Sequence, residues 1–246
     1  MISVHRAGVR FYFDRHMKVV TRGASRLRRH GSTKWGVRGV SFESPGGEGI
    51  ALIGPSGSGK TTMLRLLARV YWPDEGQVAV RGRVASLLSI DAGLLSLLTG
   101  RENAMLLGVL GALPRRASRR ALDSVKERSR LGDAFDQPVS TYSQGMRARL
   151  GFAVAEETGP QILLLDEVHE ALDHEFRDIV EQRARALVKS GGVVVASGHD
   201  HQMLERLCTR AIHVENGAIR NDGPFKPVQQ AYLAAVQAAS ESSPTW

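Results

Sequence analysis

The sequence predicts an α/β fold in which a mainly parallel β-sheet is covered by helices on both faces. Short apolar runs of strand length alternate with segments whose apolar residues recur at helical spacing. The stretch from Ser86 to Thr141 is mostly helical in pattern and interrupts this alternation, which indicates a helical insertion. A chain of 246 residues, 42% hydrophobic and 24% charged, has the length and composition of one such globular domain.

The elements expected before the insertion are two strands, a helix and a third strand. Alternating apolar and polar residues predict a strand over Val37–Glu43, and the apolar run Gly49–Ile53 predicts a buried one. Apolar residues at helical spacing predict a helix over Lys60–Tyr71, which the turn Pro73–Gly76 ends. A short strand is expected at Val78–Val80.

Helices and strands continue to alternate from the insertion to the end of the chain. A helical pattern covers Thr99–Arg130 with a break at Pro114, and Asp173 stands where its side chain can cap a later helix. Asn216-Gly217 is a strong hairpin signal. The other expected elements are helices at Ser143–Glu157, His174–Lys189 and about Pro227–Ala239, and strands at Ile162–Leu165, Val193–Ala196, Ala211–Glu215 and Ala218–Arg220.

Cysteine content and apolar run length exclude several classes of protein. The single cysteine, Cys208, cannot form an intrachain disulfide, and no Cys/His spacing suggests zinc. No run approaches the roughly 18 apolar residues of a transmembrane helix. Residues 1–15 lack the continuous apolar core of a secretory signal. We therefore expect a protein of the reducing cytoplasm that reaches a membrane only through a partner.

The net charge of +8 and the isoelectric point near 10.1 suit either nucleic acid or anionic lipid headgroups. Cations crowd two segments, residues 22–34 and residues 115–130. Beside the first segment, only Trp35 offers an aromatic ring, whereas nucleic-acid surfaces more often interleave several rings for stacking. We expect the basic insert, residues 22–34, to serve the membrane side, with a solvated basic loop as the alternative.

A phosphate-binding motif carries the main chemical signal. Gly54-Pro55-Ser56-Gly57-Ser58-Gly59-Lys60-Thr61 matches GxxxxGK[ST] in full, between a predicted strand and a predicted helix. The glycines let the backbone turn its N–H groups toward phosphate oxygens, and the helix N-terminus adds positive charge. Lys60 can reach the β- and γ-phosphates, and Thr61 can ligate Mg²⁺. The sequence therefore predicts ATP binding at a phosphate loop, residues Gly54–Thr62.

Two acids follow the apolar strand Ile162–Leu165. Asp166 and Glu167 are expected at the carboxyl end of that strand, at the sheet edge where the phosphate loop also lies. Asp166 can then hold Mg²⁺ through water, and Glu167 can polarise the water that attacks the γ-phosphate. An apolar strand followed by two acids is common by chance, so this motif gains its weight from the first.

A third motif opens the helix expected at Ser143–Glu157. Ser143, Gln144 and Gly145 supply a hydroxyl and free N–H groups at a helix start, which can form a second anion site. An ordinary N-cap serine explains the same residues. Physical reasoning from the sequence leaves both interpretations open.

Together these motifs resemble the ATPase subunit of ABC transporters over roughly residues 4–235. The resemblance implies a P-loop NTPase core of the ABC ATPase type, with N-terminal antiparallel strands and a helical subdomain at about 86–158, in one domain spanning 1–246. In that family a Ser-x-Gly helix start precedes the Asp-Glu strand, and Tyr142–Met146 stands in that place.

The resemblance also implies roles for single residues. His199 resembles the family's switch histidine, which senses the γ-phosphate beside the catalytic Glu167. Asp173 matches an aspartate that communicates across the dimer. Tyr12 falls where the family places an aromatic ring against adenine. Phe11, Phe13 and Trp35 are the alternatives for that role. The implied contacts to ATP are Tyr12, Gly54, Pro55, Ser56, Gly57, Ser58, Gly59, Lys60, Thr61, Thr62, Ser143, Gln144, Gly145 and Asp173, and those to Mg²⁺ are Thr61 and Asp166.

Several segments resemble a subfamily that exports lipid-linked polysaccharide, O-antigen, capsule or teichoic acid. They include Leu98–Asn103, Asp136–Val139, Thr141–Ala155 and the basic insert. The resemblance implies a homodimer of ATPase subunits, an integral membrane permease as partner and a lipid-linked glycan as cargo. It also implies a peripheral position on the cytoplasmic face of the membrane and no nucleic-acid partner.

The chain departs from that subfamily at a few positions. Gln144 and Gly198 replace its usual residues, and 169–172 replaces a run of small residues. No glutamine lies in Leu87–Gly93, where most ABC ATPases bind Mg²⁺ with one, and Ser89 or Asp91 are the candidate substitutes. The alternatives are an ABC exporter ATPase for a drug or lipid, and a non-transport ABC protein acting on ribosomes or DNA.

Overall fold

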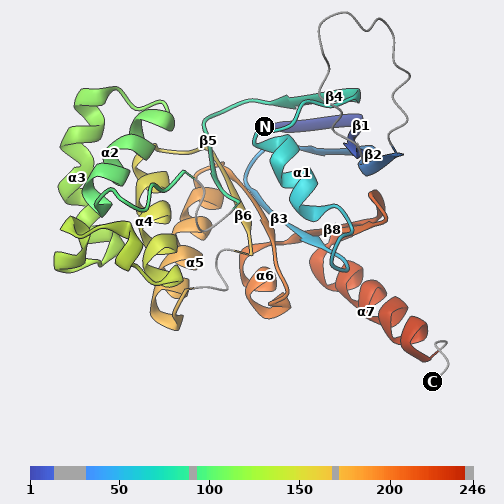
Figure 1. Ribbon diagram of the computed structural model, residues 1–246. Helices are drawn as coiled ribbons and strands as arrows, with labels where there is room; N and C mark the ends of the chain where they lie inside the picture. The colour runs from blue at the N-terminus through green and yellow to red at the C-terminus, as the bar shows by residue number, and fades with distance from the viewer. Residues whose placement is uncertain (14–31, 89–92, 168–171, 242–246) are drawn as a thin grey trace, which may run out of the picture.

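The computed structural model of the chain describes residues 1–13, 32–88, 93–167 and 172–241. These residues form two β-sheets and seven α-helices, and the expected α/β fold with a mainly parallel sheet is confirmed (Figure 1). The basic insert, except for the three residues that begin a strand, lies outside the described residues. None of the helices described is both long enough and apolar enough to cross a membrane.

The smaller sheet is antiparallel and has three strands in the order β2-β1-β4. Its strands are β1 (Ile2–Phe13), β2 (Ser32–Ser44) and β4 (Glu75–Val80). The central strand β1 is irregular, because its pairing with β2 shifts register between Val4 and Arg10. Arg6 adopts a left-handed backbone at this irregularity, with φ 45°.

The larger sheet has six strands, in the order β5-β6-β7-β3-β8-β9. All neighbours pair in parallel except the last two, which form the expected hairpin. The strands are β3 (Glu48–Ile53), β5 (Val84–Leu87), β6 (Ile162–Asp166), β7 (Val193–Ser197), β8 (Arg210–Glu215) and β9 (Ala218–Pro224). Parallel pairing brings the carboxyl ends of β3, β6 and β7 to one edge, where loops can form a site.

Helices cover both faces of the larger sheet. Helix α1 (Lys60–Leu67) lies between the two sheets, and its Met63 and Leu66 pack with alternate residues of β3, β6, β7 and β8. The other face packs against α5 (His174–Lys189), α6 (His201–Leu207) and α7 (Phe225–Glu241). The β-strand period of two thus divides the buried side chains into two cores on opposite faces.

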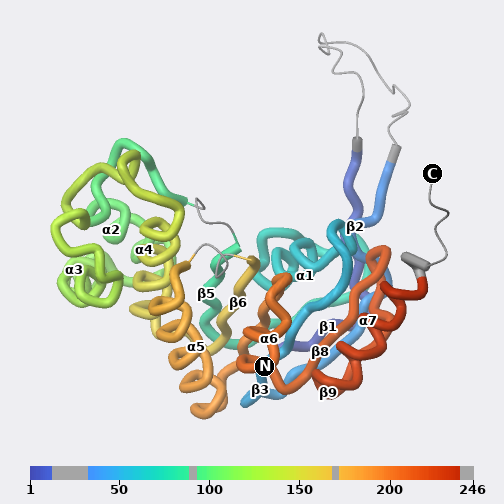
Figure 2. The backbone as a smooth tube through the Cα atoms, turned by 90° about the horizontal axis from the view of Figure 1, so that it is seen from below, coloured from blue at the N-terminus to red at the C-terminus, as the bar shows by residue number. Residues whose placement is uncertain are grey.

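A separate group of helices lies at one end of the molecule (Figure 2). It contains α2 (Gly100–Leu110), α3 (Arg115–Ser129) and α4 (Gln144–Glu157), packed around the fully buried Phe135 and Leu150. Two 3-10 turns, Gly132–Asp136 and Val139–Thr141, connect α3 to α4. The break in the helical pattern falls at Pro114, immediately before α3, as expected.

Side chains of α4 join these helices to the rest of the fold. Phe152 of α4 meets Phe176 of α5 edge to face, with ring centroids 6.0 Å apart, and belongs to the core beneath the larger sheet. Glu156 of α4 forms ion pairs with Arg183 of α5 at 3.3 Å and with Arg128 of α3 at 3.4 Å. The aromatic contact and the Glu156–Arg183 ion pair therefore join the helical group to α5.

The structure contains elements that the sequence pattern did not predict. Strand β1 gives no clear alternating pattern because its register shifts interrupt the alternation. Strand β5 and helix α6 are too short to show a period. Helix α1 ends at Leu67, four residues before the expected end. Arg69 takes a left-handed backbone there, with φ 59°, and its guanidinium donates to the carbonyl oxygen of Val80.

We expect Phe152→Ala to lower the free energy of unfolding by about 3–5 kcal/mol, because it deletes a buried ring and leaves a cavity beside Phe176. Denaturant unfolding of the purified chain measures this loss. The control is Val236→Ala on α7, which is 46% exposed and should change the unfolding free energy by no more than about 0.5 kcal/mol. Equal losses in the two variants would contradict the packing described.

Candidate functional site

The phosphate loop joins β3 to α1 at the carboxyl edge of the larger sheet, and a cavity of about 510 Å³ opens beside it. Most of the loop residues predicted to bind ATP line this cavity, as does Glu167. The lining residues are Phe11, Lys34, Trp35, Gly36, Ser56, Gly57, Gly59, Lys60, Thr61, Thr62, Glu167, Asn216 and Gly217. The volume is within the range of small-molecule sites.

Two glycines let the loop pass close to neighbouring backbone. Gly54 has φ 144°, and a Cβ there would stand 2.1 Å from the carbonyl oxygen of Val214 in β8. Gly59 has φ 115°, and its Cβ would stand 2.6 Å from the carbonyl oxygen of Gly36 in β2. A side chain at either position would collide with backbone, so these two glycines are required by packing as well as by the loop's shape.

The β8–β9 turn supports the loop from the other side. The N–H of Gly217 donates to the carbonyl oxygen of Ser58 at 2.8 Å, and the carbonyl oxygen of Gly217 accepts from the N–H of Arg38 at 2.8 Å. The hairpin turn Asn216-Gly217, recognised in the sequence only as a turn, thus forms part of the cavity wall. The chain pattern carried no signal for this contact between segments so far apart.

Lys60 is held at the loop by backbone carbonyls. Its ammonium donates to the carbonyl oxygens of Gly54 at 2.8 Å and Pro55 at 3.0 Å, and the residue is only 5% exposed. Burial lowers the pKa of Lys60, while the nearby carboxylates of Glu167 and Asp166 act in the opposite direction. A desolvated cation beside two acids is suited to a polyanionic ligand, whose phosphates can replace the carbonyls as partners.

The two acids differ in environment although they are adjacent in sequence. Asp166 ends β6, is buried, and accepts a hydrogen bond from the hydroxyl of Ser197 on β7. Glu167 has a left-handed backbone, with φ 52°, and its N–H donates to the carbonyl oxygen of Ser197 at 3.1 Å. The turn brings the half-exposed Glu167 to the cavity while Asp166 stays within the sheet edge.

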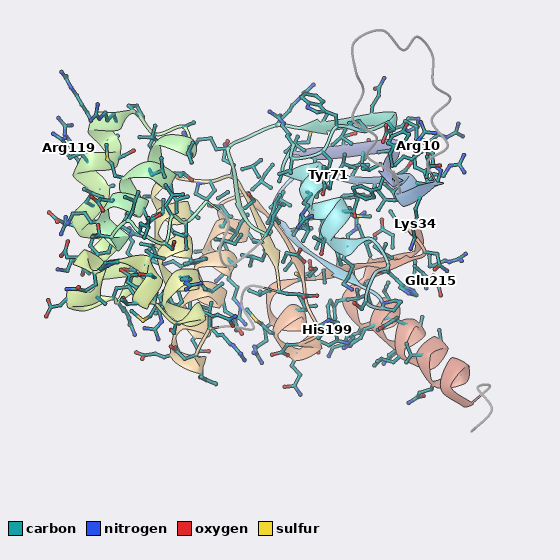
Figure 3. All side chains as sticks on the ribbon, in the orientation of Figure 1. Arg10, Lys34, Tyr71, Arg119, His199 and Glu215 are labelled. Carbon is teal, nitrogen blue, oxygen red and sulfur yellow. The ribbon has the colours of Figure 1, made fainter. Side chains whose placement is uncertain are left out.

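His199 lies beside Glu167, after the end of β7. The His199 Nε2 atom is 3.4 Å from the Glu167 Oε1 atom, and both side chains are about half exposed. Figure 3 shows His199 close to α6, away from Lys34 and Glu215 on β2 and β8. The structure thus brings together the two residues to which the resemblance assigns catalysis.

Thr61 and Asp166 are the residues that the sequence analysis expects to bind Mg²⁺. A hydroxyl and a carboxylate are hard oxygen donors, the type that Mg²⁺ prefers, and the ion usually keeps several waters and phosphate oxygens as well. Within the described ranges, no group of three or more His, Cys, Asp and Glu side chains could hold a metal ion by itself. The donor set therefore fits an ion that arrives with phosphate. Ser89 and Asp91 lie outside the described residues.

The third motif lies away from this cavity. Ser143 caps α4, where its hydroxyl accepts from the N–H of Met146 at 3.2 Å, and Ser143 and Gln144 are exposed. Neither residue nor Gly145 lines the cavity. Within one chain, these three residues and the phosphate loop do not form a single site.

Asp173 makes the predicted helix cap. Its side chain accepts from the N–H of Phe176 at 2.9 Å and forms an ion pair with Arg149 of α4. The residue is near the helical group through this pair, and it does not line the cavity. Most of the neighbouring segment 169–172 lies outside the described residues.

The aromatic residues that line the cavity, its aromatic wall, do not include Tyr12, the residue to which the resemblance assigns the adenine contact. Tyr12 is 58% exposed and lies outside the cavity, whereas Phe11 and Trp35 line it. Phe11 turns inward and meets Tyr71 edge to face, with centroids 5.5 Å apart. The guanidinium of Arg10 lies over the rings of both Tyr12 and Trp35. The cavity geometry thus favours the competitor Trp35 as the ring that meets a base.

Comparison with known proteins agrees with this chemistry. The sequence model of the family described as ABC transporter matches residues 37–170. The O-antigen export system ATP-binding protein RfbB of Klebsiella pneumoniae is 36% identical over 200 residues, 81% of each chain. The teichoic acids export ATP-binding protein TagH of Listeria innocua is 35% identical over 198 residues, 80% of this chain and 59% of that protein.

Solved structures share the fold at lower identity. A dimeric structure of a post-hydrolysis state of an ATP-binding cassette bound to ADP and Pi superposes with a TM-score of 0.74. The two sequences are 21% identical, and the match covers 92% of this chain and 99% of the other. This likeness bears on the fold, and the chemistry rests on the residues described above.

We expect Trp35→Ala to weaken ATP binding by about 1–3 kcal/mol, the usual contribution of one base stacked on an aromatic ring. Tyr12→Ala should leave ATP affinity unchanged because Tyr12 does not line the cavity. Equilibrium dialysis with ATP measures both affinities, and inorganic triphosphate, which lacks a base, serves as a control ligand. A loss of ATP affinity in Tyr12→Ala alone would return the role to Tyr12.

Proposed function

We propose that this chain, which belongs to the ABC transporter family, is the ATP-hydrolysing subunit of an exporter of lipid-linked polysaccharide. ATP hydrolysis is the activity of the family, and the chain carries the phosphate loop and acids that this activity needs. The observation that supports the proposal most strongly is that Lys60 of the phosphate loop and Glu167 line the same cavity.

Residues that line the cavity or lie beside it have separate roles in phosphoryl transfer. Backbone N–H groups of the phosphate loop and the charge of Lys60 hold the β- and γ-phosphates. Glu167 takes a proton from the attacking water, and His199, 3.4 Å from it, fixes the carboxylate and contacts the γ-phosphate. Mg²⁺, held by Thr61 and by Asp166 through water, supplies neutralisation of phosphate charge when bound.

A second copy of the chain completes the site in this proposal. Ser143, Gln144 and Gly145 stand at an exposed helix start, remote from the cavity of their own chain. In a two-fold dimer, each phosphate loop faces the Ser143 group of the partner copy, and two equivalent sites form. Asp173, at the nearby start of α5, then lies close to the dimer contact.

The relatives support a glycan as the cargo. Their names assign them to O-antigen and teichoic acid export, and each match covers most of this chain. We therefore place the subunit at the cytoplasmic face of the membrane, held there by an integral membrane permease. The same names count against export of a drug or other lipid, and against action on ribosomes or DNA.

Glu167→Gln should keep ATP binding and lower the rate of hydrolysis by about 10²–10⁴-fold, because an amide cannot accept the proton of the attacking water. Steady-state phosphate release and ATP dialysis measure the two quantities. The matched control is Glu127→Gln on the exposed face of α3, which should hydrolyse ATP like the unaltered chain. Near-normal turnover in Glu167→Gln would sink the catalytic assignment.

Ser143→Arg should prevent ATP-dependent dimerisation and leave ATP binding to single copies intact, since a long cation at the helix start blocks the partner's γ-phosphate. Light scattering measures the dimer fraction in ATP and in ADP. The measurement uses Glu167→Gln because that variant retains its bound ATP. The control is Ser190→Arg at the end of α5, which should dimerise normally. A dimer fraction that is independent of nucleotide counts against the composite site.

A further inference from the structure

Tyr232 of α7 lies against two histidine rings from two other elements. Its ring centroid is 5.8 Å from that of His201 in α6 and 5.0 Å from that of His213 in β8. The two rings are inclined to Tyr232 by 57° and 61°. These distances and angles are those of favourable tilted aromatic contacts. One tyrosine therefore ties together three elements that are separate in the sequence.

Both histidines adjoin the proposed site. His201 is the first residue of α6, and its N–H donates to the carbonyl oxygen of His199 at 3.0 Å. His213 pairs in register with Ile53, the last residue of β3 before the phosphate loop. Tyr232 thus contacts the segment that carries His199 and, at the same time, the strand beside the loop.

The surroundings of His201 and His213 favour the neutral form of both imidazole rings over the charged form. Burial lowers the pKa of His213, and burial followed by the charge of His199 lowers the pKa of His201. His213 is only 5% exposed, and its Nδ1 atom has no hydrogen-bond partner among the described residues. Neutral rings pack favourably against an aromatic ring, and for His213 no hydrogen bond at Nδ1 competes with the contact to Tyr232.

Tyr232 lies at the outer limit of the part of α7 that packs against the core. Phe225 and Val228 are buried in the core beneath the larger sheet, and Tyr232 is the last α7 residue that packs against that core. Leu233 and Val236 are 44% and 46% exposed, and the helix runs out from the body of the molecule (Figure 1). Tyr232 therefore makes the outermost of these contacts between α7 and the core.

We infer that Tyr232 is a positioning residue for ATP hydrolysis: it holds segment 199–201 so that His199 stays against Glu167. It touches neither nucleotide nor Glu167, and it acts on turnover through His199 rather than on ATP binding. The inference rests on the roles proposed above for His199 and Glu167. Ordinary core packing is the competing explanation, and the two differ in what they predict for kcat, KM and paired substitutions.

The test compares Tyr232→Ala, Tyr232→Phe and Leu233→Ala in the full-length chain. Tyr232→Ala should lower kcat by about 10- to 100-fold, the scale of a small misplacement of a catalytic group, with an unchanged KM for ATP. Tyr232→Phe keeps the ring and should restore kcat. Leu233→Ala removes an exposed side chain at the next position and should behave like the unaltered chain.

A double substitution separates positioning from a general loss of structure. If Tyr232 acts through His199, then adding Tyr232→Ala to His199→Ala should lower kcat no further, because the group to be positioned is gone. Additive losses, or a matching rise in KM, would overturn the inference. Tyr232→Leu, which fills the site without a ring, tests the same point if Tyr232→Ala fails to fold.

The outcomes also separate this inference from the proposed function. Normal kcat in Tyr232→Ala with a large loss in His199→Ala would overturn the positioning role and leave the ATPase assignment intact. Normal kcat in His199→Ala would overturn the proposed role of His199 and, with it, the inference about Tyr232.

Discussion

Parallel pairing of β3, β6 and β7 is the constraint on which the site depends. Ser197 of β7 stands opposite Leu52 on one side and Asp166 on the other, so the three strands end at one level. The hydroxyl of Ser197 donates to Asp166, and its carbonyl oxygen accepts from the N–H of Glu167. Ser197 therefore fixes the positions of Asp166 and Glu167 relative to the phosphate loop that follows β3.

The walls of the cavity and the Ser143 helix start are attached to this edge by different kinds of contact. Backbone meets backbone where the loop passes β2, β8 and the hairpin turn, so the aromatic wall is fixed relative to the loop. The helical group is attached through side chains, including the buried Phe152 and the ion pair between Glu156 and Arg183 of α5. Partly exposed ion pairs contribute about 1 kcal/mol or less each. Ser143 is therefore placed through packed and paired side chains, whereas the aromatic wall is placed through backbone contacts.

The sequence could predict the parts of the site that lie within a few consecutive residues. The phosphate loop and the Asp166-Glu167 pair each combine a strand with the polar residues that follow it, so local pattern suffices. Tyr12 is on β1 and Trp35 is on the neighbouring strand β2. Which of the two rings faces the cavity depends on the register between these strands, and the register shifts break the simple alternation that would reveal it. The wall contributed by Asn216-Gly217 arises from contacts between distant segments, which a single sequence does not reveal.

Helix α7 acts mechanically as a cantilever. Its nine residues beyond Tyr232, up to Glu241, span about 14 Å at the rise of an α-helix. Among the described apolar side chains of α7, that of Tyr232 is the outermost to pack against the core beneath the larger sheet. A force on the far end of α7 would turn the helix about its outermost core contact, Tyr232. The torque is then borne first by the two histidine rings, so strain from that end of the molecule enters at the segment next to the catalytic edge.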